Sequence, residues 1–175
     1  MCGISTKTNK LDAIIRKVNK KTKLFATRKT APGLRYFDKI AVEIGGGKKH
    51  RMTLHEMIMF KDNHLAVGKS IFSLIAKAKR TRKKIEVEVE NEKDAILVAT
   101  LGVDIIMLDN FTPKQIKNTI NNLISLNLRK KVKIEASGGI NEKNIARYAR
   151  TGVDMISVGE ITNSVQGIDL SLEIN

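Results

Sequence analysis

The stretch Lys84-Ile85-Glu86-Val87-Glu88-Val89-Glu90 alternates strictly between apolar and acidic side chains. Alternation with a period of two is typical of a β-strand, because successive side chains point to opposite faces of the sheet. A strand inside an open sheet covered by helices on both faces is apolar on both faces, so this glutamate face needs water or cationic partners. A barrel lumen that is also lined by Lys29 and Lys61 would supply such partners. An exposed edge strand is the alternative.

Segments with helical and strand-like patterns alternate along the chain on both sides of this stretch. Apolar residues recur at helical spacing in residues 8–19, 34–41, 71–78, 91–99, 112–124 and 141–149. Short runs typical of strands occupy residues 23–27, 42–44, 57–60, 84–90, 103–108, 131–136 and 153–158. Such alternation predicts a parallel sheet with right-handed crossovers and helices outside. We therefore expect an α/β fold, a TIM-like (β/α) barrel that has six or seven strands and is incomplete.

Three shorter patterns complete the prediction. Thr53 and Glu56 have the spacing of a capping box, which predicts the start of a short helix. Gly45-Gly46-Gly47 indicates a loop that bends sharply or approaches another part of the chain closely. A last alternating segment runs from Ile168 to Ile174.

Length and composition limit the class of protein. With 175 residues, of which 42% are hydrophobic, the chain has the length of one ordinary domain, and we expect residues 1–175 to form one. The single cysteine, Cys2, excludes an internal disulfide framework and indicates a reducing compartment. The sequence has neither an apolar run near the roughly 18 residues of a membrane helix nor a signal-like N-terminus. We therefore expect a cytoplasmic protein without a membrane partner.

The net charge of +14 is compatible with nucleic acid, an anionic membrane surface or small acidic substrates. Many of the cations lie in the runs 17–23, 77–84 and 129–133, which are typical of solvated faces. An RNA-binding surface usually interleaves aromatic residues with basic ones, and this chain has no Trp, two Tyr and five Phe. We therefore expect no nucleic-acid partner and keep general nucleic-acid binding only as a weak alternative.

Cations between apolar segments distinguish the stretch from Phe25 to His64. They are Arg28, Lys29, Arg35, His50, Arg51, Lys61 and His64. Two short pieces, 26–30 and 59–64, place such residues where a strand stops, which is where barrels and open α/β sheets build their sites. This stretch predicts a pocket for small, multiply anionic molecules.

Polar or glycine-rich residues also follow the other strands, and in a parallel barrel all these ends meet at one rim. The turns Ser137-Gly138-Gly139 and Gly159 follow the last two strands, where barrels bind phosphate on backbone N–H groups. Glu90 and Asp109 end two consecutive strands and could hold a hydrated Mg²⁺ that bridges to phosphates. Neutralisation of Lys29 and Lys61 is the alternative role for these carboxylates.

An ordered set of motifs carries a family resemblance over nearly the whole chain. The motifs are Thr27-Arg28-Lys29-Thr30-x-Pro-Gly-Leu-Arg, Gly-Gly-Gly-x-x-His50-Arg51, Lys61-Asp62-Asn63-His64, Glu88-Val89-Glu90-Asn91, Met107-Leu108-Asp109-Asn110, Glu135-Ala136-Ser137-Gly138-Gly139-Ile140 and Ile156-Ser157-Val158-Gly159. In these motifs the chain resembles quinolinate phosphoribosyltransferases, which are also called nicotinate-nucleotide pyrophosphorylases (carboxylating).

The resemblance implies an enzyme of NAD biosynthesis that uses Mg²⁺ and is a homodimer or higher oligomer. The implied reaction converts quinolinate and phosphoribosyl pyrophosphate to nicotinate mononucleotide, pyrophosphate and CO₂. The resemblance also implies that quinolinate is bound by Arg28, His50, Arg51 and Lys61. It assigns ribose and phosphates to Lys29, Glu90, Asp109, Ser137, Gly138, Gly139 and Gly159, with Glu90 and Asp109 near the metal. The implied catalytic residues are Lys29, Lys61, Glu90 and Asp109.

Departures from the family pattern keep other functions open. Family members carry an N-terminal α+β sandwich domain that supplies an arginine to the partner subunit's pocket, and this chain is expected to lack that domain. Glu160 and Asn163 stand where the family often has Ala and His. The alternatives are an inactive fragment or paralogue that serves as a ligand-binding or assembly module, and a related family linked to molybdenum transport. Lys61-Asp62 favours the pyridine enzyme over the latter.

Overall fold

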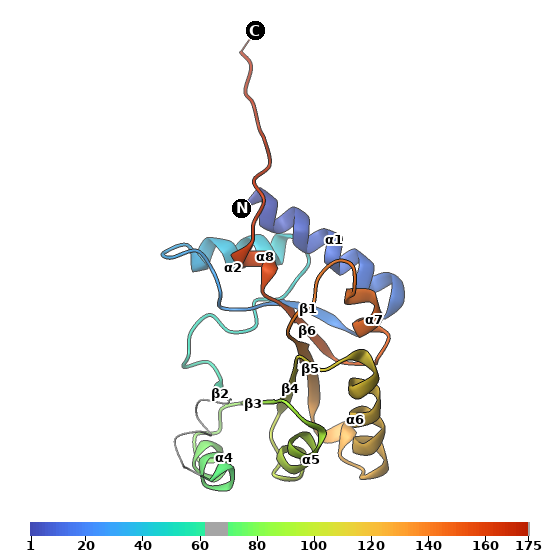
Figure 1. Ribbon diagram of the computed structural model, residues 1–175. Helices are drawn as coiled ribbons and strands as arrows, with labels where there is room; N and C mark the ends of the chain where they lie inside the picture. Colours follow the sequence, from blue (N-terminus) through green and yellow to red (C-terminus); the bar gives the residue numbers. More distant parts are fainter. Residues whose placement is uncertain (62–69, 175) are drawn as a thin grey trace.

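The computed structural model describes residues 1–61 and 70–174, in which a parallel sheet is surrounded by helices (Figure 1). The motif residues Asp62, Asn63 and His64 lie outside the described residues. The six strands of the described sheet have the order β1-β6-β5-β4-β3-β2. Their bounds are β1 Lys23–Ala26, β2 Ile58–Phe60, β3 Ile85–Val89, β4 Ile105–Asp109, β5 Lys133–Ser137 and β6 Met155–Val158.

The strand order is that of a barrel left open between its first two strands. All described strand pairs are parallel, and β1 and β2 form the two edges. On the open side of β1, Lys48 forms an isolated parallel bridge with Phe25, so the chain between α2 and β2 contributes a rudimentary seventh position. The predicted α/β fold, an incomplete TIM-like barrel with six or seven strands, is therefore confirmed, and the structure adds that the parallel sheet is not closed by hydrogen bonds.

The helices lie around the outside of this sheet, as Figure 1 shows. Their bounds are α1 Cys2–Val18, α2 Arg35–Ile44, α4 Ile71–Lys79, α5 Glu92–Thr100, α6 Pro113–Ser125, α7 Ile145–Ala149 and α8 Glu160–Asn163, with a 3₁₀ turn at Arg129–Lys131. The predicted caps are present: the Asn91 side chain accepts the N–H of Asp94 at 2.9 Å, and Thr112 forms a capping box with Gln115. Among the described residues, no helix is long and apolar enough to cross a membrane.

The alternation of β3 separates the hydrophobic core from a charged interior. Ile85, Val87 and Val89 are buried in the main apolar cluster. The opposite face carries Glu86, which is fully buried, and Glu88, which is partly buried. Because β3 lies between β2 and β4, it is not an exposed edge strand, and its acidic face is turned into the sheet's concave side as the barrel prediction requires.

Three local predictions are corrected by the structure. Residues 42–44 belong to helix α2 instead of a strand, so the three glycines end a helix. They are needed for close packing against α1, since a Cβ on Gly45 would lie 2.5 Å from the carbonyl oxygen of Ser5. Glu56 accepts the N–H of Thr53 at 3.3 Å and of Met52 at 3.0 Å, but no helix follows. The segment from Ile168 to Ile174 has no regular secondary structure and is exposed.

Candidate active site

Five of the seven predicted cations line one cavity at the carboxyl ends of the strands; Arg35, on helix α2, does not line it, and His64 lies outside the described residues. This cavity has a volume of about 410 Å³. Its lining includes all four residues assigned above to a dicarboxylate, namely Arg28, His50, Arg51 and Lys61. Lys29, Met59, Glu88, Met107, Asp109, Glu135, Ser137 and Ser157 also line it. The structure thus brings the cations that follow β1 and β2, and those of the segment between these strands, to side chains from β3, β4, β5 and β6.

A second cavity, of about 510 Å³, adjoins the first and contains the glycine turns. Ser137, Gly138, Gly139 and Gly159, the residues predicted to hold phosphate, all line it. Lys29 and Asp109 line both cavities. Asp109 is paired in register with Ser137, which places the carboxylate at the entrance to the β5 turn. The two predicted groups of binding residues therefore face adjoining spaces that share one wall.

Backbone geometry requires glycine at the turn after β5, whereas Gly159 after β6 has an ordinary helical φ of −67°. Gly138 has a φ of +89°, and a Cβ there would lie 2.2 Å from Oδ1 of Asn110. At Gly159 a Cβ would lie 3.9 Å from Cδ of Lys29, so the lysine side chain passes close above this turn. Thr162, on the short helix that follows, donates to the carbonyl oxygen of Lys29 at 2.7 Å. The β6 turn and the lysine-bearing loop are thus held together.

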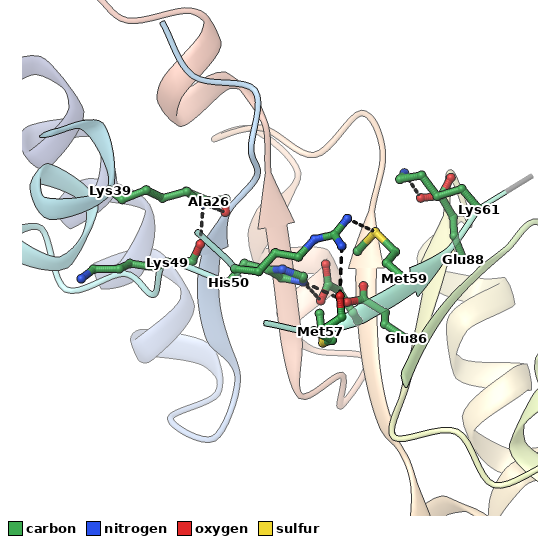
Figure 2. Close-up of polar contacts among 11 residues, drawn as sticks. Ala26, Lys39, Lys49, His50, Met57, Met59, Lys61, Glu86 and Glu88 are labelled. Carbon is green, nitrogen blue, oxygen red and sulfur yellow. Dashed lines mark hydrogen bonds and ion pairs between the residues drawn. The ribbon is translucent and has the colours of Figure 1, made fainter. Parts of the chain in front are cut away.

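The floor of the cation cavity is a buried histidine with two glutamates. His50 Nε2 donates to Glu135 Oε2 at 3.2 Å and forms an ion pair with Glu86 Oε2 at 3.3 Å (Figure 2). Both glutamates are fully buried. Burial alone would lower the pKa of His50, but the hydrogen bonds and charges of Glu135 and Glu86 outweigh it and raise that pKa to about 9. Burial raises the pKa of Glu86, and His50 opposes this only in part.

Two further contacts orient the cations at the β2 side. Lys61 forms an ion pair with Glu88 (Figure 2). Arg51 donates to the carbonyl oxygen of Met57 at 3.3 Å and to Sδ of Met59 at 3.0 Å. Within the described residues, Nε of Arg28 is buried without a hydrogen-bond partner. Because buried donors are normally paired, an unpaired guanidinium N–H beside the cavity favours an anionic ligand.

One predicted site residue lies elsewhere. Glu90 follows the end of β3, is exposed, and lines a separate cavity with Asp94 and Leu97, not either of the two cavities described above. Glu88 occupies the place in the cation cavity that Glu90 was expected to take. Glu88 and Glu90 point to the same face of the strand, so the alternating pattern could not show which of them lines the cation cavity. The end of the strand at Val89 makes the difference.

Sequence reasoning also passed over Glu86 and Glu135 as site residues. The period-two pattern of β3 did place Glu86 on the acidic face, which was a usable signal. Glu135 comes from β5 and meets His50 only through the curvature of the sheet. Side-chain oxygens and nitrogens of His50, Glu86 and Glu135 lie within 4.8 Å of one another, a spacing that could hold a cation. With its raised pKa, however, His50 is protonated at neutral pH and acts as a donor.

Comparison with known proteins now identifies the family. A model of the family described as "Quinolinate phosphoribosyl transferase, C-terminal domain" matches residues 4–173. The chain belongs to this family. A curated relative from Archaeoglobus fulgidus, named "Probable nicotinate-nucleotide pyrophosphorylase [carboxylating]", is 47% identical over 99% of this chain and 67% of its own length. The Dictyostelium discoideum nicotinate-nucleotide pyrophosphorylase [carboxylating] is 37% identical over 99% of this chain and 60% of its own length.

Solved structures of relatives share the fold. The nicotinate-nucleotide pyrophosphorylase of Francisella tularensis superposes with a TM-score of 0.89 and 42% identity, covering 97% of this chain and 59% of that protein. The resemblance stated from the sequence motifs is thereby confirmed. The chain spans about six-tenths to two-thirds of the length of these quinolinate phosphoribosyltransferase relatives.

Proposed function

We propose that the protein is a phosphoribosyltransferase that makes nicotinate mononucleotide from quinolinate and phosphoribosyl pyrophosphate in NAD biosynthesis. The observation that carries this proposal is the pair of adjoining cavities: one is lined by Arg28, His50, Arg51 and Lys61, and the other by the glycine turns. A dicarboxylate in the first and a sugar phosphate in the second would meet at the shared wall formed by Lys29 and Asp109.

The cation cavity suits a pyridine dicarboxylate. Arginine presents its N–H groups in a planar fork that matches a carboxylate, and both Arg28 and Arg51 line this space. His50 is protonated because of Glu86 and Glu135, so it adds a third positive donor. Met59 and Met107 supply apolar contact for the ring. A dicarboxylate held in this way would lie beside the shared wall formed by Lys29 and Asp109.

The reaction moves charge in a direction that this site can stabilise. The ring nitrogen attacks C1′ of the ribose as the C1′–O bond to pyrophosphate breaks, so negative charge grows on the departing oxygen. Lys29, at the shared wall, faces that charge without reorganising. The carboxylate at C2 then leaves as CO₂, its bonding electron pair stays on C2, and C2 takes up a proton. The cations around the ring stabilise the negative charge that develops there.

The carboxylates that could hold Mg²⁺ are Asp109 and Glu88, in place of the expected Glu90. They come from neighbouring strands and line the same cavity, and carboxylate oxygens beside phosphate oxygens are the ligands that Mg²⁺ prefers. When bound, Mg²⁺ would supply positive charge that neutralises the pyrophosphate. Glu88 also forms an ion pair with Lys61, so a bound Mg²⁺ would share this carboxylate with the lysine.

We also propose that the protein acts in the cytoplasm as a homodimer or higher oligomer. Helix α2 supports the proposal of an oligomer. Its Tyr36 and Phe37 pack edge to face with ring centroids 5.5 Å apart, and they are 62% and 50% exposed. Exposed aromatic surface is typical of an interface between protein chains. Light scattering coupled to size-exclusion chromatography measures the assembly, and a monomer at all concentrations would contradict this part.

The test combines binding and turnover. Calorimetry should detect quinolinate binding by this chain, and chromatography should detect nicotinate mononucleotide when quinolinate, phosphoribosyl pyrophosphate and Mg²⁺ are all supplied. Binding without turnover would favour the alternative of a ligand-binding or assembly module. Absence of both would reject the proposal.

A further inference from the structure

Lys39 is a fully buried lysine that the proposed chemistry does not use. It lies on α2 and is 0% exposed. Its Nζ donates to the carbonyl oxygen of Ala26 at 2.7 Å and to the carbonyl oxygen of Lys49 (Figure 2). The ammonium therefore joins a helix to two separate stretches of backbone.

Both acceptors stand next to the residues that line the cation cavity. Ala26 is the last residue of β1 and is followed by Thr27-Arg28-Lys29. Lys49 directly precedes His50-Arg51. One buried side chain thus fixes the starting points of the two segments that carry Arg28, Lys29, His50 and Arg51.

Among the described residues, backbone hydrogen bonds join β1 to the segment before His50 only at the isolated bridge. Lys48 donates its N–H to Leu24 at 2.8 Å, and Ala26 donates to Lys48 at 3.1 Å. These two bonds make up the isolated bridge, and no other bridge between the two segments is found in the described chain. His50 then has a φ of +60°, so the chain turns away from β1 immediately afterwards. The Lys39 contacts continue the pairing by one residue on each segment, at the place where the backbone pairing ends.

Burying the charged ammonium of Lys39 costs free energy of folding. Burial, together with the charges of Arg35, Arg28 and Arg51, lowers the pKa of Lys39 to about 8, and Glu56 opposes this only in part. A methionine of similar shape would fill the same space without that cost. The two hydrogen bonds to backbone carbonyls are what a methionine could not replace.

We propose that Lys39 is a positioning residue, which holds segments 27–29 and 50–51 at the spacing that a bound dicarboxylate requires. This inference rests on the proposed function of the cation cavity. Lys39 does not line that cavity, so it acts through Arg28, His50 and Arg51. The hydrogen bonds of Lys39 do not reach the turn after β5, whereas the turn after β6 is linked to segment 27–29 through the hydrogen bond from Thr162 to the carbonyl oxygen of Lys29.

The test compares Lys39→Met with Thr22→Val. Thr22 is also buried and donates to a backbone carbonyl, that of Val153, at 2.6 Å, but at the opposite ends of the strands, so its variant controls for a general loss of stability. Calorimetry should show quinolinate affinity reduced at least tenfold in Lys39→Met and within twofold of wild type in Thr22→Val. Binding of ribose 5-phosphate, followed by amide shifts of Gly138 and Gly139, should stay within twofold in Thr22→Val. In Lys39→Met it should fall less than quinolinate affinity does, because Lys29 lines that cavity but Arg28, His50 and Arg51 do not.

Hydrogen exchange separates failure of this inference from failure of the proposed function. In Lys39→Met the amide of Lys48 should exchange at least tenfold faster, while that of Ile106 in the centre of the sheet does not change. Unchanged quinolinate affinity in a folded Lys39→Met variant would overturn the positioning role. If the wild type binds no quinolinate, the proposed function fails, and an unchanged Lys48 amide would then overturn the positioning role as well.

A second variant covers the case in which Lys39→Met does not fold. Lys39→Gln keeps a polar group but has a side chain one bond shorter, so it cannot reach both carbonyls from the same backbone position. The same tenfold loss of quinolinate affinity is expected. Wild-type affinity in Lys39→Gln, with wild-type exchange at Lys48, would overturn the inference.

Discussion

The pKa of His50 is the most direct quantity by which to test the electrostatics of the cation cavity. The imidazole is 7% exposed and contacts two fully buried carboxylates, which raise its pKa from 6.5 to about 9. Replacement of both carboxylates in Glu86→Gln/Glu135→Gln leaves only the effect of burial. The pKa of His50 should then fall below its ordinary value of about 6.5.

The raised pKa of His50 also makes the stability of the protein depend on pH. His50 has a raised pKa in the folded state, so its contribution is fully present below pH 6.5 and is lost as the pH rises through about 9. Since one pKa unit corresponds to about 1.4 kcal/mol, the loss amounts to about 3 kcal/mol. The raised pKa of Glu86 likewise makes the stability fall as the pH rises. Lys39 has a lowered pKa, so the cost of burying its charge is relieved, and the stability rises, as the pH goes from about 8 to 10.5.

The assay is a titration of the histidine C–H signals by NMR together with urea unfolding at pH 6.5 and 9.5. Lys39 is present in both proteins, so its contribution cancels in the difference between them. The wild type should lose about 3 kcal/mol more than the double variant between the two pH values. Assignment of the signal uses His50→Gln. A wild-type His50 that titrates near 6.5, or equal losses in the two proteins, would refute the ion-pair argument.

Three further predictions address the cavities and the metal. Arg51→Ala should weaken quinolinate binding at least about 30-fold, since a buried charged contact is worth about 2 kcal/mol or more; calorimetry showing less than threefold would contradict this. Gly138→Ala should lower the free energy of urea unfolding by about 2 to 4 kcal/mol, because of its φ of +89° and the clash with Asn110; a change below about 0.5 kcal/mol would show that the turn adapts. Glu88→Gln should raise the Mg²⁺ concentration for half-maximal turnover about tenfold, whereas the matched control Glu90→Gln should leave it within twofold; the reverse order would restore Glu90 as the ligand.

Much of the fold followed from local pattern. The alternation of residues 84–90 required a charged interior, and the structure places Glu86 there, fully buried. The caps at Asn91 and Thr112 were predictable because capping depends on side chains three residues apart. Residues 42–44 could not be assigned correctly, because three residues before a glycine run fit a strand end and a helix end equally well. Contact with α1 decides the matter.

The candidate site was predictable to the extent that each strand end is marked by its own residues. Arg28, Lys29, Lys61 and the glycine turns were identified in this way, and the parallel arrangement brings them to one rim. Glu90 does not line the cation cavity, because β3 ends at Val89, and Glu88, two residues earlier on the same face, lines it instead. Glu135 was missed because its role depends on a histidine 85 residues away in sequence.

The sequence by itself determined the alternation of helices and strands outside residues 42–56, the acidic face of β3 and the membership of the family, because these depend on periodicity and on ordered motifs within short stretches. Only the tertiary structure decided which carboxylate lines the cation cavity, which glutamates raise the pKa of His50, and which lysine lies buried against two backbone carbonyls. The physical reason is that burial and charge act through space. Curvature of the sheet sets the distances between strand ends, and those distances determine the electrostatics of the site.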